Sequence, residues 1–344
     1  MSQLDGATVL VTGGAGFIGS HLVDHLLESA DVAHVTVVDN LVNGSLDNLD
    51  HRLVDPRFTM VVGDIRDGSV LETSLKGISV VFHLACLGVR HSLHAPVENH
   101  DVNASGTLKL LEESRAAGVQ RFINVSSSEV FGTAQFVPMT ETHPTWPETV
   151  YGGSKLAGEA YARAFFRTYG FPTVVVRPFN TFGPRSHFEG DSGEMIPRTI
   201  VRMLAGQSPV IFGSGEQTRD FMHVSDTVRG LVGLANCDEA IGQTVNFGSG
   251  TEITMNTLCK VIAQAMDRTD LSPEHLPGRP GDVGRLLVDG SFIQKLTGFQ
   301  PEMSFEAGIR DVVNWFAQKS SDSADLISRV ADTNWNSLSE VVSK

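Results

Sequence analysis

A glycine-rich turn between a strand-like run and a helix-like run constrains this chain more than any other feature. The run Thr8–Thr12 is apolar and β-branched, and Gly13, Gly14, Gly16 and Gly19 follow it ahead of an amphipathic stretch. Glycines let the backbone approach a pyrophosphate, and the N-terminus of the following helix offers free N–H groups and the positive end of a dipole. The pattern predicts a βαβ unit that binds a dinucleotide.

A second strand-like run, His34–Asp39, ends in an acid 20 positions after Gly19. A carboxylate at this place accepts hydrogen bonds from ribose hydroxyls, which favours NAD over NADP as the cofactor. Asp64 and Ile65, which follow a third strand-like run at Thr59–Gly63, are expected to lie beside the adenine. The residues expected to bind NAD in these segments are Gly13, Gly16, Phe17, Ile18, Gly19, Asp39, Asn40, Asp64, Ile65, Leu84 and Ala85.

Strand-like and helix-like runs alternate through the first half of the chain, which predicts an α/β, Rossmann-type, doubly wound parallel sheet. The expected strands are Thr8–Thr12, Val35–Asp39, Thr59–Gly63, Val80–Leu84, Arg121–Ser126 and Thr173–Arg177. The expected helices are Ser20–Glu28, Ser69–Leu75, Asn103–Ala117 and Val150–Tyr169. In such a sheet the ligand site lies at the carboxyl ends of the strands, where the strand order reverses.

Glycine and proline become denser after the last of these strands, which predicts a change of domain. We expect an NAD-binding Rossmann domain over residues 1–180 and a smaller C-terminal substrate-binding domain over 181–320. A short return to the main sheet is expected near 245–250, and residues 321–344 are expected to form a peripheral tail.

Composition excludes several partners. With 26 Lys and Arg against 40 Asp and Glu, the net charge of −14 argues against nucleic acid as a partner. Cys86, Cys237 and Cys259 form no CxxC motif, and His21 and His25 have no accompanying carboxylate pattern, so no metal site is expected. The chain shows no signal-peptide pattern and no long apolar stretch, so we expect a cytoplasmic protein without a membrane partner.

A tyrosine and a lysine four positions apart give the sharpest chemical signal. On a helix, this spacing puts Tyr151 and Lys155 on one face. An ammonium near a phenol is expected to lower the pKa of the tyrosine, which can then act as a base or an acid. Tyr151 follows Ser127, in the middle of the serine cluster Ser126–Ser128, by 24 residues.

Together these motifs resemble the extended short-chain dehydrogenase/reductase family, specifically its NAD-dependent nucleotide-sugar epimerases, dehydratases and decarboxylases. The resemblance covers residues 7 to 316. It rests on Thr12-Gly-Gly-Ala-Gly-Phe-Ile-Gly19, Asp39-Asn40, Gly63-Asp64, His83-Leu-Ala85, Asn103-x-x-Gly-Thr107, Ser126-Ser-Ser-Glu-Val-Phe-Gly132, Tyr151-Gly-Gly-Ser-Lys155, Arg177-Pro-Phe-Asn180, Gly183-Pro-Arg185, Thr218-Arg-Asp-Phe221, His223-Val-x-Asp226 and Arg279-Pro-Gly-Asp282.

The resemblance implies a role for each site residue. Lys155 would hold the nicotinamide ribose, and Tyr151 would remove the proton of a sugar C4 hydroxyl as hydride passes to NAD⁺. Ser127 would hydrogen-bond the same oxygen. The residues expected to bind substrate are Arg90, Ser128, Asn180, Arg185, Arg219, Arg279 and Asp282, with Arg219 and Arg279 on the two phosphates. Relatives pair the helices Asn103–Ala117 and Val150–Tyr169 between subunits, which implies a homodimer.

Glu129 is the residue that bears on the reaction. The resemblance associates Ser-Ser-Glu at this place with dehydratases and decarboxylases, and Ser128 stands where many dehydratases carry a second acid, so Glu129 would serve two roles. The sequence therefore favours a UDP-sugar 4,6-dehydratase with Ser127, Glu129, Tyr151 and Lys155 as catalytic residues. A 4-epimerase remains an alternative, because the loop Gly88–Ser92 resembles a loop of some 4-epimerases. A UDP-glucuronate decarboxylase and a non-catalytic NAD-binding protein are further alternatives.

Overall fold

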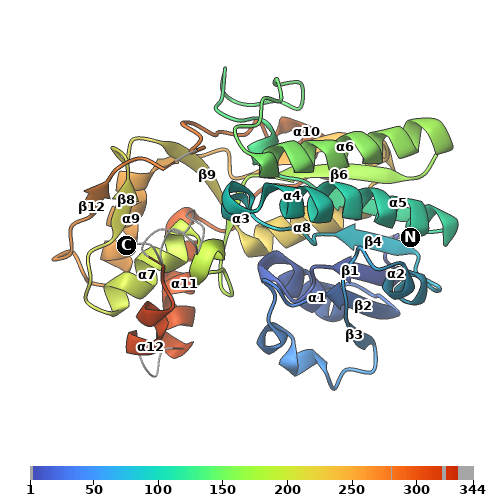
Figure 1. Cartoon of the computed structure of the whole chain (residues 1–344), viewed down its shortest axis with the longest axis horizontal. Coiled ribbons are helices and arrows are strands. Elements are labelled where there is room, and N and C mark those ends of the chain that lie inside the picture. Colours follow the sequence, from blue (N-terminus) through green and yellow to red (C-terminus); the bar gives the residue numbers. More distant parts are fainter. Residues whose placement is uncertain (1–2, 280, 320–322, 332–344) are drawn as a thin grey trace.

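The computed structural model describes residues 3–279, 281–319 and 323–331, and a seven-stranded parallel sheet runs through its centre (Figure 1). The strand order is β10-β6-β5-β4-β1-β2-β3. The strands are β1 Thr8–Thr12, β2 His34–Asp39, β3 Phe58–Val62, β4 Val80–His83, β5 Arg121–Val125, β6 Thr173–Pro178 and β10 Thr244–Phe247. The predicted doubly wound sheet is confirmed, and each expected strand agrees with the observed one to within one residue at either end.

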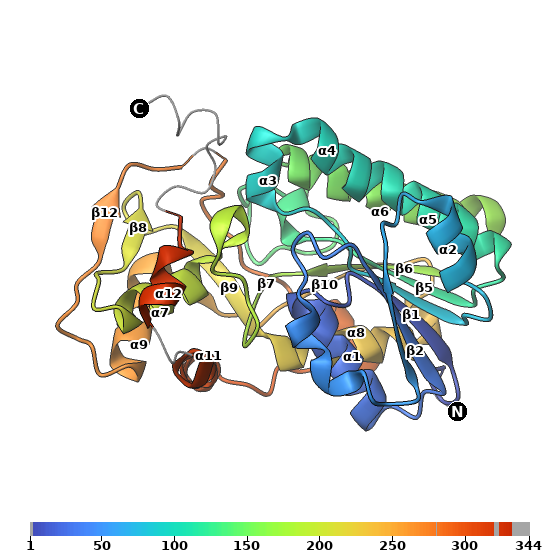
Figure 2. The ribbon, with the colours of Figure 1, turned by 60° about the horizontal axis from the view of Figure 1, so that its bottom comes forward.

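Helices cover both faces of this sheet, which makes three layers (Figure 2). One face carries α1 (Phe17–Ser29), α8 (Val224–Ala235) and α10 (Ser291–Thr297). The other carries α2 (Gly68–Ser74), α5 (Thr107–Ala116) and α6 (Val150–Tyr169), with the short α3 (Val89–His94) and α4 (Pro96–His100) beside α6.

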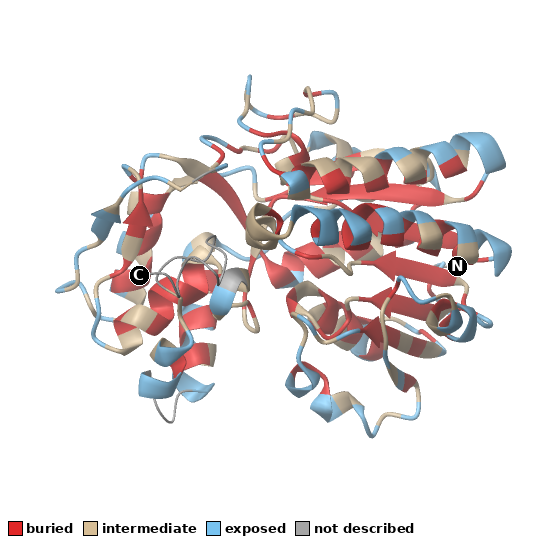
Figure 3. Cartoon of the chain, viewed as in Figure 1, coloured by how far each residue is buried: buried red, intermediate tan, exposed pale blue. Residues whose placement is uncertain are grey.

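The side chains of each strand alternate between these two helical layers. Val9 and Val11 of β1 pack in the α1 and α8 layer, whereas Leu10 packs in the α5 and α6 layer. Both faces of the sheet are therefore apolar, as a parallel sheet requires, and Figure 3 shows its strands buried along most of their length.

The strand order reverses at β1, which pairs with β2 on one side and with β4 on the other. The connections that follow β1 and β4 diverge at this point and leave a crevice at the carboxyl ends of the strands. The 3₁₀ segments η1 (Leu46–Asn48) and η2 (Asp50–Arg52) follow β2, and η4 (Ser128–Val130) follows β5.

A second lobe contains two small sheets and its own apolar core. Its strands are β7 (Asn180–Phe182), β8 (Val210–Phe212), β9 (Thr218–His223), β11 (Glu252–Thr254) and β12 (Glu274–Leu276). Its helices are α7 (Met195–Leu204), α9 (Met255–Ala265), α11 (Phe305–Lys319) and α12 (Ser323–Ser328), with η5 (Gly190–Ser192) before α7. Within the described residues, no helix has the length and apolar character to span a membrane.

The segment 181–320 is divided between the two lobes, to a larger extent than the sequence indicated. Strand β10 pairs with β6, and α8 and α10 pack on the main sheet beside it. The reason is that Leu231 and Leu234 of α8 are buried against α1 in the main core. The 3₁₀ segment η6 (Asp238–Ala240) connects α8 to β10. Of the expected tail, 323–331 is described and packs on α7, and 332–344 lies outside the described residues.

Helix α6 is fixed at both ends and at its middle, which sets the position of Tyr151 and Lys155. Thr149 Oγ1 accepts a hydrogen bond from the Gly152 amide at 3.2 Å at the N-terminus. Glu159 accepts two hydrogen bonds from Arg177 of β6, at 2.8 Å and 2.6 Å, inside the core. A buried bidentate pair of this kind ties the helix to the sheet in one register.

The neighbouring helix begins later than expected. A π-helical turn, η3 (Asp101–Gly106), precedes α5 where the sequence predicted regular helix from Asn103. Asn103 Nδ2 donates to the Leu87 carbonyl at 3.0 Å, and Asn103 Oδ1 accepts from the Leu87 amide at 2.8 Å. These hydrogen bonds connect the π-helical turn to the loop after β4. A prediction from hydrophobic periodicity cannot include such a tertiary contact.

Candidate active site

A cavity of about 450 Å³ lies at the strand-order reversal, between the main sheet and the second lobe. Its volume is in the range of sites that bind small molecules and cofactors. Nearly all residues expected at the site from the sequence line it. They are Gly13, Gly16, Phe17, Ile18, Gly19, Asp39, Asn40, Asp64, Ile65, Leu84, Ala85, Arg90, Ser127, Ser128, Glu129, Tyr151, Lys155, Asn180, Arg219, Arg279 and Asp282.

Arg185 is the exception, and its position does not support the expected contact with substrate. Its guanidinium pairs with Asp24 of α1 at 2.7 Å, and it lines a separate hollow beside Asp47 and Trp315. The chain turns at Arg185 through a left-handed conformation, φ 65°, so its side chain leaves the cavity and rests on α1.

The glycine turn has the shape that a dinucleotide needs. Gly13 has φ 71°, and a Cβ there would lie 2.7 Å from the Ala85 amide nitrogen. A Cβ at Gly19 would overlap the Gly13 carbonyl oxygen. Gly16 begins α1 without a side-chain cap, so amides of the first turn remain free to bind an anion. These features fit the pyrophosphate of NAD.

Asp39 and Asp64 form the acidic end of the cavity. Asp39 accepts hydrogen bonds from the amides of Ala15 at 3.0 Å and Leu41 at 2.8 Å, which hold its carboxylate at the wall. Burial raises the pKa of Asp39, although these two hydrogen bonds act to lower it. The hydrogen-bonded Arg66 guanidinium lowers the pKa of Asp64 to about 2. Both carboxylates suit the hydroxyls of a ribose and the amine of an adenine.

Tyr151, Ser127 and Lys155 converge at the middle of the cavity. The Ser127 hydroxyl hydrogen-bonds the Tyr151 phenol and also accepts the Glu129 amide at 3.2 Å, which fixes its orientation. Lys155 Nζ donates to the Val125 carbonyl at 2.6 Å, so the lysine is anchored to the end of β5.

The expected lowering of the Tyr151 pKa is wrong for the protein alone. Burial raises the pKa of Tyr151 well above its ordinary value, and the nearby Cys86, Glu129 and Glu194 raise it further. A phenolate loses more hydration than a phenol when it is buried, and negative neighbours add to that cost. The environment of Tyr151 in the protein alone therefore disfavours the phenolate.

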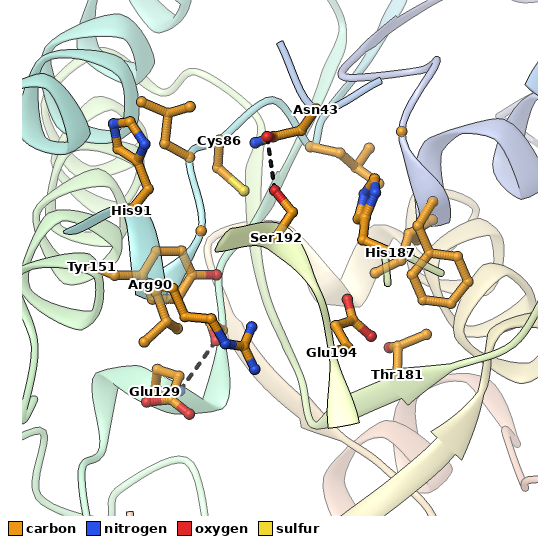
Figure 4. A pocket seen from close by; sticks show the side chains of 18 of the residues that line it. Asn43, Cys86, Arg90, His91, Glu129, Tyr151, Thr181, His187, Ser192 and Glu194 are labelled. Carbon is orange, nitrogen blue, oxygen red and sulfur yellow. Dashed lines mark hydrogen bonds between the residues drawn. The ribbon is translucent and has the colours of Figure 1, made fainter. Parts of the chain in front are cut away.

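Two carboxyl groups flank a half-buried arginine in the same region (Figure 4). Arg90 lies between Glu129 and Glu194, and its Nε is buried without a hydrogen-bond partner among the described residues. Burial raises the pKa of Glu129, and burial raises the pKa of Glu194 to about 7. Burial also lowers the pKa of Arg90 to about 10. The burial of these groups thus shifts the pKa of each acid upward and that of the arginine downward.

Two arginines share one aspartate at the far wall. The guanidinium groups of Arg219 and Arg279 each donate to Asp282 Oδ1 at 2.8 Å. Arg219 is buried and is held further by the Thr218 carbonyl at 2.8 Å. The Asn180 Oδ1 atom is buried with no partner in the described structure. The pair of arginines suits two phosphates, and the amide suits a ligand that donates a hydrogen bond.

Sequence reasoning missed two residues of the cavity wall. No motif of the sequence marks Glu194, yet it lines the cavity at the point where the apolar helix α7 begins. Cys86 is half-buried and also lines the cavity, near Tyr151. Among the described residues, no group of three or more His, Cys, Asp or Glu side chains is arranged to hold a metal ion.

Comparisons with known proteins agree with this geometry. A sequence model of the GDP-mannose 4,6 dehydratase family matches residues 10–312. The chain belongs to this family. It is also 37% identical over 310 residues to a putative UDP-glucose 4-epimerase of Methanocaldococcus jannaschii, which covers 89% of this chain and 97% of the relative. A dTDP-glucose 4,6-dehydratase of Actinoplanes sp. is 35% identical, over 90% of this chain and 97% of its own length.

Solved structures lead to the same group. The dTDP-glucose 4,6-dehydratase DesIV of Streptomyces venezuelae, determined with NAD bound, superposes with a TM-score of 0.85 at 32% identity. The match covers 90% of this chain and 97% of that one. The chain is thus an NAD-dependent enzyme that modifies nucleotide sugars. Its relatives include 4-epimerases, 4,6-dehydratases and UDP-glucuronic acid decarboxylases. Sequence identity therefore does not show which of these three reactions this enzyme catalyses.

Proposed function

We propose that this enzyme is a UDP-sugar 4,6-dehydratase. The observation that carries the proposal is the Glu129 carboxyl group. It lines the cavity beside Ser127 and Tyr151, and no described residue donates a hydrogen bond to it. A glutamate that capped a turn would have such a donor, whereas a catalytic base needs a free carboxyl group that faces the substrate.

The first step produces a 4-keto sugar. A bound NAD would supply the acceptor for the C4 hydride and, after reduction, the hydride donor. Ser127 holds the C4 oxygen, and Tyr151 takes the hydroxyl proton. Lys155 holds the nicotinamide ribose, and the positive charge of the oxidised nicotinamide offsets the burial that raises the Tyr151 pKa.

The second step needs a carboxyl group that both accepts and donates a proton. The ketone makes the C5 proton acidic, and Glu129 removes it. The C6–O bond then breaks, and the proton returns to the departing hydroxyl as water. The returned hydride adds to C6, and a proton adds to C5, which gives a 6-deoxy-4-keto sugar. The raised pKa of Glu129 suits this exchange because its two protonation states lie closer to neutrality.

The charges of the cavity favour a sugar with a C6 hydroxyl over one with a C6 carboxylate. Arg90 lies between Glu129 and Glu194, so part of its charge is already offset by two carboxyl groups before a C6 carboxylate could pair with it. This argues against a decarboxylase. Arg219 and Arg279 would bind the diphosphate, Asn180 would position the sugar and Asp282 would accept from the nucleoside ribose. On this assignment residues 1–180 hold most of NAD, and the second lobe holds most of the nucleotide.

A 4-epimerase is the second candidate, because Ser127, Tyr151 and Lys155 suffice for oxidation and return of hydride at C4. Glu129→Gln separates the two. For a dehydratase, the variant forms the 4-keto sugar and reduced cofactor, visible by nicotinamide absorbance, but releases no dehydrated product by mass spectrometry. Glu141→Gln is the matched control, because the pKa of Glu141 is also raised by burial but its side chain lies outside the cavity. If Glu129→Gln interconverts two epimers at the wild-type rate, the dehydratase proposal is wrong.

We also propose that the enzyme is a homodimer that pairs α5 and α6 between subunits. Ala160 and Ala164 are exposed on α6, and Leu108 of α5 is 39% exposed. Leu111 of α5 is buried in the core and does not belong to this face. Ala164→Glu is expected to shift the sedimentation coefficient to that of a monomer, and an unchanged coefficient would contradict the proposed interface.

A further inference from the structure

The loop 187–194 joins β7 to α7 and forms part of the cavity wall. It contributes His187, Ser192 and Glu194 to the lining (Figure 4). The Ser192 hydroxyl donates to Asn43 Oδ1 at 2.9 Å, which connects the loop to the segment that follows β2. The Glu194 amide donates to the His187 carbonyl at 2.7 Å and closes the loop on itself. The inner side of the loop thus meets both the cofactor segment and the substrate region.

The outer side of the same loop is held by the C-terminal segment. Helix α12 packs beside α7 through the buried Leu326, which brings residues 329–331 against the loop (Figure 2). The Gly190 amide donates to the Arg329 carbonyl at 3.2 Å, and the Arg329 guanidinium pairs with Glu189 at 2.8 Å.

Two further contacts extend this attachment. The Arg329 guanidinium lies over the ring of Phe188, 5.1 Å from its centroid, and Phe188 is buried against Phe316. Arg198 of α7 donates to the Ala331 carbonyl at 2.5 Å. The outer contacts are ionic, aromatic and main-chain in type, so they specify one position of the loop better than apolar packing alone.

We propose that residues 323–331 act as a clasp that positions the loop 187–194 over the cavity. The clasp acts through the loop: Arg329 holds Phe188, Glu189 and Gly190 from outside, and the loop in turn holds Ser192 on Asn43 and places Glu194 near Arg90. Arg329 is therefore a positioning residue without contact to the ligands. The clasp lies beyond residues 10–312, which match the family model.

The position of the loop, and not only the folding of the lobe, depends on the clasp. An exposed ion pair and a cation–π contact together are worth about tenfold in a local equilibrium, which equals about 1.4 kcal/mol. Loss of Arg329 is thus expected to open the loop about tenfold more often without unfolding the core of α7, α9 and α11. The loop amides should exchange faster, and NADH should dissociate faster as the contact between Ser192 and Asn43 weakens.

The test compares Arg329→Ala with Arg268→Ala. Arg268 also pairs with an acid, Asp270, and also donates to a carbonyl of α7, but it does not touch the loop. Hydrogen exchange of the 187–194 peptide and the NADH dissociation rate, followed by nicotinamide fluorescence, are measured on each full-length protein. Neither readout needs turnover, so they stay informative whichever sugar reaction the enzyme performs.

We expect about tenfold faster exchange of the 187–194 peptide and faster NADH release in Arg329→Ala, with wild-type values in Arg268→Ala. A double variant, Arg329→Glu with Glu189→Arg, restores the ion pair with reversed charges and is expected to recover part of the protection that Glu189→Arg alone loses. The proposal is wrong if Arg329→Ala matches the control in both readouts. It is also wrong if the double variant exchanges no more slowly than Glu189→Arg.

Discussion

The half-buried carboxyl group of Glu194 allows a quantitative prediction of how the free energy of unfolding depends on pH. Burial raises its pKa from the ordinary 4.5 to about 7 in the folded enzyme. The folded state therefore binds this proton more tightly than the unfolded state does. The resulting contribution to the free energy of unfolding is fully present below the ordinary pKa and is lost as the pH rises through about 7.

The size of the effect follows from the two pKa values. A shift from 4.5 to about 7 corresponds to at most about 3 kcal/mol, at about 1.36 kcal/mol for each tenfold change in proton affinity. Glu194→Gln keeps the shape of the side chain and removes the titration. Between pH 5 and pH 8.5, the wild type is expected to lose about 1 to 3 kcal/mol relative to this variant, because at pH 5 the carboxyl group of the unfolded chain is already mostly ionised.

Urea unfolding at fixed protein concentration, at both pH values, measures this difference directly. Glu274→Gln, at an exposed position of β12, is the control and is expected to follow the wild type. Glu194→Gln should be the more stable protein at pH 8.5 and equal to the wild type at pH 5. If the variant and the wild type show the same dependence on pH, Glu194 titrates as an exposed acid, and the account of the cavity is wrong.

Three further variants test other parts of the site. Tyr151→Phe is expected to retain NAD, measured by cofactor stoichiometry, and to lose about 10²- to 10⁴-fold in kcat; near wild-type turnover would remove Tyr151 from proton transfer. Arg219→Ala should raise KM for the nucleotide sugar about 10- to 100-fold with little change in kcat, since a charged hydrogen bond to a phosphate is lost; an unchanged KM would move the diphosphate elsewhere. Arg177→Met leaves Glu159 buried without its main partner and should lower the free energy of unfolding by about 3 to 5 kcal/mol in urea, whereas a loss below about 1 kcal/mol would mean that Glu159 finds water.

The main sheet was predictable because its signals are local. Each strand is a short apolar run that ends in a turn, and Val150–Tyr169 carries both its N-cap signal and its helical period in the sequence. The division of 181–320 between two lobes was not predictable, because it depends on how Leu231 and Leu234 meet α1 across a long separation in sequence. The π-turn before α5 likewise depends on a tertiary contact of Asn103.

The site was predictable where a motif carries the residue, as for Gly13 or Tyr151. It was not predictable where position depends on the path of a loop. Arg185 leaves the cavity through one left-handed residue, and Glu194 enters it at the start of an apolar helix. The direction of the Tyr151 pKa shift was also missed, because spacing shows that Lys155 is near but not that burial outweighs it.

The central claim is that the 4-keto sugar loses water, and the mass of the product tests it most directly. The purified enzyme is incubated with UDP-, dTDP-, GDP- and CDP-sugars, and the mass of each product is measured by mass spectrometry. The account predicts a UDP-sugar product lighter by one water, with no net change in NAD. A product of unchanged mass that is a new isomer, or one lighter by carbon dioxide, would contradict it.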